Sequence, residues 1–160
     1  MDTTADRRFD DHCLAHGVLF EAQVQPGANY DVAVEHDGQL WISGQVPRVQ
    51  GVIAVTGSLG GVVALADGRR AAAICVLRAL AIAQQRLGSL ARVARVLRMT
   101  VYVHSDAGFT QQSEVADGAS EILYAVFAPV GAHTRTSVGV AQLPKDAAVE
   151  IDLVLALQPA

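Results

Sequence analysis

Residues 30–36 alternate in hydrophobicity with the period of two that is typical of a half-buried β-strand. In this segment Tyr30, Val32 and Val34 alternate with Asp31, Ala33 and Glu35. An Asp37-Gly38 pair separates the segment from a second strand-like run at 40–43. Because both central residues of a type I′ turn adopt positive φ, an Asp-Gly pair at this place predicts a β-hairpin.

Three other segments are predicted to be helical. The strongest is 65–87, in which apolar residues follow the helical period and Gly88 supplies the end signal. A shorter helix is predicted at 6–16, and a second long helix at 109–127.

The remaining segments predict strands and one long loop. Residues 92–104 are rich in Val and are expected to form a central strand. The segments 133–142 and 148–157 are predicted to be the last two strands and to form a second hairpin. Glycines and other turn residues dominate 47–61, which predicts a long loop.

The order of elements is therefore helix, hairpin, helix, strand, helix, hairpin. This order predicts an α+β two-layer sandwich, with a mixed sheet of about five strands and two long helices on one face. Because no linker divides the sequence, we expect one domain over 1–160, with 1–16 as an N-terminal helical extension.

Composition narrows the range of partners. Hydrophobic residues make up 51% of the chain, which is enough to bury a core, but aromatic residues make up only 5%. A core of small aliphatic side chains favours self-association, which would bury further apolar surface. The net charge of −4 leaves no excess of Lys and Arg for a phosphate backbone, so no nucleic-acid partner is predicted.

The distribution of apolar and cysteine residues favours a cytoplasmic protein without a membrane partner. The N-terminal residues 1–11 are polar and contain no signal-peptide pattern. The longest apolar stretch, 71–83, is interrupted by Arg78 and is too short to span a bilayer. Cys13 and Cys75 form neither a CxxC motif nor a disulfide framework, which is typical of a reducing compartment.

Two weaker motifs predict no cofactor. His12 and His16 have an i, i+4 spacing that suits metal ligands, but a polar helix face is the favoured interpretation. The Gly-rich segment 57–61 lacks the Lys-Ser/Thr of a phosphate-binding loop and is interpreted as a flexible loop. We therefore expect neither a metal ion nor an organic cofactor.

Arg135 is the strongest candidate for a functional residue. It shares one face of a predicted strand with His133 and Ser137. A guanidinium is costly to bury unpaired, and its planar geometry matches a carboxylate through two parallel hydrogen bonds. The alternative is a structural ion pair with Glu150 or Asp152 on the strand predicted to lie beside it, and the pattern alone favours that pair.

Glu150 interrupts the apolar strand at 148–157. A partly buried carboxyl group can have a raised pKa, which suits it to proton transfer near neutral pH. The alternative is an outward-facing position in an alternating strand, and the local pattern favours that position.

Two motifs resemble the Rid/YjgF family of enamine/imine deaminases. They are Ser-Gly-Gln-Val-Pro at 43–47 and Thr-Arg-Thr-Ser-Val-Gly-Val-Ala-Gln-Leu-Pro-Lys-Asp-Ala-Ala-Val-Glu-Ile at 134–151. The predicted order of elements agrees with that family over about 17–157. Segments 115–120 and 131–135 resemble a less characterised branch with a Gly-x-His-x-Arg motif. The resemblance implies a chorismate mutase-like fold of the bacterial trimeric type, with pockets between the subunits of a homotrimer.

The resemblance also implies a role for each of four residues. Arg135 matches the arginine that holds the substrate carboxylate, and Glu150 matches the glutamate that positions or activates water. Tyr30 matches a pocket tyrosine, and Gly44 matches a glycine whose backbone lines the site. The implied activity is cofactor-independent hydrolysis of 2-aminoacrylate-like enamines or imines, with a small carboxylate or 2-oxo acid as the ligand.

Three positions depart from the deaminase branch. Ser137 stands in place of a cysteine, His133 in place of a proline or alanine, and Asp117 in place of an asparagine near the pocket. These residues are candidates for substrate binding, and they also favour an alternative function as a non-catalytic protein that binds or senses a small carboxylate. The endoribonuclease activity with which the family has been labelled is the least favoured, because the chain is acidic.

Overall fold

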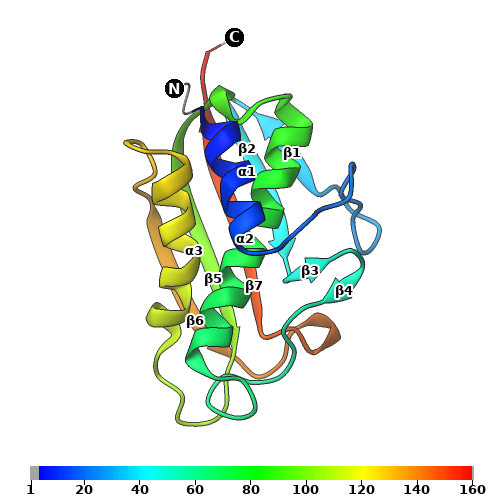
Figure 1. Cartoon of the computed structure of the whole chain (residues 1–160), viewed down its shortest axis with the longest axis vertical. Coiled ribbons are helices and arrows are strands. Elements are labelled where there is room, and N and C mark those ends of the chain that lie inside the picture. Colours follow the sequence, from blue (N-terminus) through cyan, green and yellow to red (C-terminus); the bar gives the residue numbers. More distant parts are fainter. Residues whose placement is uncertain (1–3, 160) are drawn as a thin grey trace.

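Helices lie on one side of a mixed sheet in the computed structural model, which describes residues 4–159 (Figure 1). α2 (Leu65–Leu87) and α3 (Gln112–Val126) pack beside each other, and α1 (Ala5–Ala15) lies on their outer side. This arrangement confirms the predicted α+β two-layer sandwich with two long helices on one face.

The sheet has the strand order β1-β2-β7-β5-β6. Its strands are β1 (Ala33–His36), β2 (Gln39–Gln45), β5 (Val93–His104), β6 (Thr134–Val140) and β7 (Val149–Leu157). β5 and β6 run parallel, and the other neighbouring pairs are antiparallel. A separate small ribbon of β3 (Arg48–Val49) and β4 (Val52–Ile53) lies inside the segment that was predicted to be a loop.

α2 begins and ends at the predicted residues. Gly88 follows it with φ +82° and donates its N–H to the Gln84 carbonyl at 2.8 Å, which ends the helix. The alanines at 71–73 are buried, and their small side chains let the helix pack closely on the sheet. Neither α2 nor any other described helix combines the length and the apolarity that a membrane span needs.

The first hairpin forms at Asp37-Gly38, both with positive φ, as predicted. Its first strand differs from the prediction, because β1 begins only at Ala33. Ala33 is the buried residue of β1, whereas Tyr30 and Val34 are about half exposed. The inward face of β1 is therefore set by the pairing of Ala33 with Ile42 under α2, and not by its larger apolar side chains.

The prediction that the last two strands form a hairpin was wrong. Among the described strands β6 pairs only with β5, and β5 lies between β6 and β7. The physical reason is α3, which connects β5 to β6 as a crossover and so makes these two strands parallel neighbours. The chain then crosses over β5 to place β7 in the middle of the sheet. The ion pair predicted between neighbouring strands therefore cannot form in this chain.

The face of the sheet that points away from the helices carries large apolar side chains. Val34 and Trp41 are cross-strand neighbours on β1 and β2, and 52% and 54% of their surfaces are exposed. Within residues 4–159 no helix packs on this face. We refer to it below as the open face.

Candidate functional site

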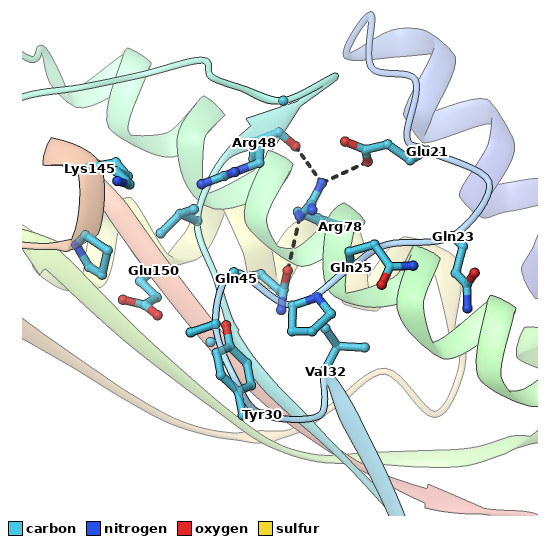
Figure 2. A pocket seen from close by; sticks show the side chains of 17 residues that line it. Glu21, Gln23, Gln25, Tyr30, Val32, Gln45, Arg48, Arg78, Lys145 and Glu150 are labelled. Atoms are coloured by element: carbon cyan, nitrogen blue, oxygen red, sulfur yellow. Dashed lines mark hydrogen bonds and ion pairs between the residues drawn. The ribbon is translucent and has the colours of Figure 1, made fainter.

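A cavity of about 440 Å³ lies where β2 ends and β7 begins (Figure 2). The parts of the chain that line it are residues within 21–32 and 44–51, Arg78 of α2, and residues within 144–150. Three of the residues singled out in the sequence, Tyr30, Gly44 and Glu150, belong to this lining. The tertiary fold thus brings them together, although they lie far apart along the chain.

Glu150 is the acidic group at the start of β7. Its carboxyl group packs against Gly44 so closely that a Cβ at position 44 would collide with it. Burial raises the pKa of Glu150, and the nearby negative charge of Asp152 raises it further. Because Gly44 has no side chain, it leaves room for the Glu150 carboxyl group, whose pKa is raised, to face the cavity.

Arg78 is a buried charge in the cavity wall that the sequence analysis did not select as a site residue. It is 5% exposed, and its Nε–H donates to the Gln45 side-chain oxygen at 3.1 Å. Its Nη1 donates to the Glu21 carboxylate at 3.2 Å and to the Arg48 carbonyl at 3.1 Å (Figure 2). The guanidinium therefore joins two segments of the wall, 21–32 and 44–51, to α2. Its signal in the sequence was the interruption of the apolar stretch 71–83.

Two further cations stand at the rim of the cavity. Arg48 is partly buried on β3, and Lys145 is exposed in the turn before β7. Figure 2 shows their side chains directed toward each other on the Glu150 side of the cavity. Lys145 is the only lysine in the sequence, and its backbone is left-handed, with φ +58°.

Arg135 lies on β6, away from this cavity, and contacts α3. Its Nη1 donates to the Asp117 carboxylate at 2.8 Å and to the Ser120 hydroxyl at 3.0 Å. Its Nη2 donates to the Ser113 carbonyl at 3.3 Å, and 24% of the side chain is exposed. The partner in its ion pair is therefore Asp117, and not Glu150 or Asp152 as the pattern favoured.

His133 extends this polar group through Ser120. The His133 Nδ1 lies 2.8 Å from the Gly131 carbonyl, so this nitrogen carries a hydrogen and donates it. In the neutral ring the Nε2, 3.0 Å from the Ser120 hydroxyl, then accepts from Ser120. This pairing of Ser120 with His133 had no signal at a recognisable spacing in the sequence. Ser137 lies at the edge of the group, 3.4 Å from the Ser113 hydroxyl.

The two groups are separated within one chain. Arg135 is the register partner of the buried Met99 and so points to the helices, whereas Glu150 is paired with Tyr102 on the other face. Arg135 and Glu150 are three residues apart in the direction of the strands and two strand spacings apart across the sheet, which is about 10 Å in each direction. Arg135 and Glu150 of one chain therefore cannot contact the same small ligand.

Similarity to known proteins agrees with the sequence motifs. The family model described as Endoribonuclease L-PSP matches residues 20–157. Protein TCP17 of Trypanosoma cruzi is 40% identical over 158 residues, which cover 98% of this chain and 99% of that protein.

Two solved structures have the same fold. Atu1372 from Agrobacterium tumefaciens, described as a protein of unknown function, is 34% identical with a TM-score of 0.87, and the match covers 96% of this chain and 94% of that one. E. coli TdcF, solved with bound serine, is 21% identical with a TM-score of 0.61, covering 89% of this chain and 98% of its own. The fold is the chorismate mutase-like fold that the motifs implied. The chain belongs to the Endoribonuclease L-PSP family, also called the Rid/YjgF family.

Proposed function

We propose that the protein hydrolyses small enamine or imine carboxylates of the 2-aminoacrylate type and releases ammonia. The observation that carries this proposal is the Glu150 carboxyl group, which has a raised pKa and faces a cavity beside Tyr30 and Gly44. A carboxyl group of this kind can accept a proton from water and return it to a leaving group. Membership of the Rid/YjgF family supports the same class of reaction.

The reaction needs only proton transfers and water. The enamine is protonated at carbon to give the iminium ion, and water then adds to the C=N carbon. Glu150 takes a proton from that water and gives it to the nitrogen, the C–N bond breaks to release ammonia, and the remaining hydroxyl loses its proton to solvent as the C=O bond forms. The products are a 2-oxo acid and ammonia, and the atoms balance without an oxidant or a cofactor.

Arg135 is proposed to hold the substrate carboxylate. A guanidinium has five N–H donors, and Arg135 uses three of them within the described part of the chain. The Nε–H and one Nη2 hydrogen remain for a ligand oxygen. Asp117 and Ser120 fix the orientation of the guanidinium, which lowers the entropy cost of binding.

The separation of Arg135 from Glu150 supports a site that two subunits share. We propose a homotrimer in which Arg135 of one chain faces the Glu150 cavity of the next. The exposed Trp41 and Val34 of the open face supply apolar surface for such an assembly. A mass of three chains in solution, measured by light scattering, is the expected result, and a monomer would contradict the shared site.

A second candidate function is binding of a small carboxylate without turnover. The observation that favours it is the pair of Arg135 with the Asp117 carboxylate at 2.8 Å, because the deaminase branch has an asparagine at this position and the surroundings of the arginine therefore depart from the catalytic pattern. The serine in E. coli TdcF shows a small carboxylate bound to a protein of this fold, and it is compatible with both candidates. Ribonuclease activity is disfavoured by the net charge of −4.

The decisive experiment follows 2-oxo acid release from an imine that an auxiliary enzyme generates in the same solution. We expect acceleration by the wild type and a loss of about 10²–10⁴-fold in Glu150→Gln, because general acid–base catalysis is removed. Arg135→Ala is expected to raise the KM for the substrate, because the substrate carboxylate loses the guanidinium that binds it. Arg70→Ala, at an exposed position of α2 outside the cavity, is the control for lost positive charge.

The outcomes separate the candidates. Equal rates for wild type, Glu150→Gln and Arg135→Ala would exclude the deaminase. Binding of 2-oxobutyrate by the wild type, abolished in Arg135→Ala and without any imine hydrolysis, would establish the carboxylate-binding protein instead.

A further inference from the structure

The rim of the cavity carries two positive charges that no residue within 4–159 neutralises. Among the described residues, neither the Arg48 guanidinium nor the Lys145 ammonium has a hydrogen bond or an ion pair. Their ends nevertheless point toward each other above Glu150 (Figure 2). Like charges converge at a cost unless an anion lies between them, so this arrangement is suited to an anionic group of a ligand.

The other charges of the cavity do not offset this pair. Glu21 is occupied by the buried Arg78, at 3.2 Å. The lining carries three cations, Arg48, Arg78 and Lys145, and two carboxyl groups, Glu21 and Glu150. Even with both carboxyl groups ionised the balance of charge is positive, and the surplus lies at the rim with Arg48 and Lys145.

Both cations are held in place by the backbone that carries them. The Arg48 carbonyl accepts from Arg78, which fixes β3 against α2. Lys145 and Asp146 both have left-handed backbones, with φ +58° and +59°, although neither is a glycine. The Asp146 carbonyl accepts from the Gly57 N–H at 2.9 Å, and this bond helps to hold the unusual turn. Hydrogen bonds therefore fix the backbone from which the two side chains extend, which helps a pair of cations to bind an anion.

We propose that Arg48 and Lys145 bind a second carboxylate of the substrate, so that the protein acts on imines or enamines of dicarboxylic amino acids. This inference rests on the proposed deaminase site: the first carboxylate lies on Arg135 of the neighbouring chain, and the C=N carbon lies at Glu150. A guanidinium grips a carboxylate with two hydrogen bonds, and the ammonium adds a point charge. A volume of about 440 Å³ has ample room for a compound of four or five carbons.

The test compares two ligands that differ only in the distal carboxylate. 2-Oxopentanoate and 2-oxoglutarate have the same chain length, and calorimetry gives the affinity of each for the full chain. We expect 2-oxoglutarate to bind about tenfold or more tightly to the wild type, which is the size of a charge-assisted contact. This preference should shrink as salt is added, because the rim is open to solvent.

Substitutions of Arg48 and Lys145 test whether the preference for 2-oxoglutarate over 2-oxopentanoate arises at the rim of the cavity. Arg48→Gln and Lys145→Gln should each remove most of it while leaving the affinity for 2-oxopentanoate unchanged, which also shows that the variants are folded. Arg70→Gln changes the net charge equally at an exposed position of α2 outside the cavity and should keep the full preference.

Failure of this inference is distinguishable from failure of the proposed function. Equal affinities of the wild type for the two ligands, together with normal imine hydrolysis, would overturn the dicarboxylate specificity alone. A preference that persists in both rim variants would overturn the role of Arg48 and Lys145. Absence of both binding and hydrolysis would overturn the shared site, and with it this inference.

Discussion

The Arg135 group and the Glu150 cavity differ in how fully the chain satisfies its own charges. Arg135 donates to a carboxylate, a hydroxyl and a carbonyl, and the adjoining His133 ring is hydrogen-bonded at both nitrogens. The cavity instead has two cations at its rim that pair with none of the described residues, and a carboxyl group whose pKa is raised by burial. The hydrogen bonds of the Arg135 group fix the orientation of one guanidinium, whereas the Glu150 cavity retains charges that a ligand can neutralise.

This difference explains why one chain cannot contain the whole proposed site. The Arg135 and Glu150 side chains leave the sheet on different faces, and each region lacks what the other supplies: a clamp for the carboxylate or a group that transfers protons. Three substitutions test the contrast, and they follow from the largest expected effect to the smallest.

Gly44→Ala is expected to damage the cavity most. The added Cβ would collide with the Glu150 carboxyl group and displace it, and a small misplacement of a catalytic group costs about 10²-fold in turnover. Imine hydrolysis measures this loss. Gly27→Ala is the matched control in the same cavity wall, because its Cβ would come no closer than 3.9 Å to the Tyr30 hydroxyl. Equal activity of the two variants would show that the close packing of Glu150 on Gly44 is not needed for turnover.

Arg78→Met is expected to lower the free energy of unfolding by about 2 kcal/mol, because Gln45 and the Arg48 carbonyl lose a buried partner. The half-exposed Glu21 can be solvated, which keeps the loss below that of a fully buried pair. Urea denaturation gives the value, and Arg95→Met is the control. A loss no larger than that of the control would show that Arg78 does not hold the cavity wall together.

Asp117→Asn is expected to have the smallest effect, in the opposite direction. The amide oxygen still accepts from Arg135, but the negative charge that competes with a ligand is gone. We expect roughly twofold to tenfold tighter binding of 2-oxobutyrate, since the ion pair is partly exposed and screened. Glu121→Gln, on the same helix, removes the same charge from a pair with Arg69. An unchanged affinity in Asp117→Asn would mean that Asp117 does not compete with the ligand for Arg135.

Local pattern determined the elements of this protein. The helix at 65–87 and the turn at Asp37-Gly38 were predictable because hydrogen bonds four residues apart and turn geometry depend on near neighbours in the chain. The motif at 134–151 also predicted the family, and with it the fold. The cavity residues Tyr30, Gly44 and Glu150 were named from that motif and from the one at 43–47, together with the family's pocket tyrosine.

Only the tertiary structure decided which residues meet. Strand order depends on contacts between distant segments, so the sequence did not show that β5 separates Arg135 from Glu150. For the same reason it did not show that Arg78 is buried at the end of β2, or that Arg48 and Lys145 lie on one side of the cavity with no partner in the described part of the chain. Whether a charge is paired is a property of its surroundings, and those surroundings are assembled only when the sheet forms.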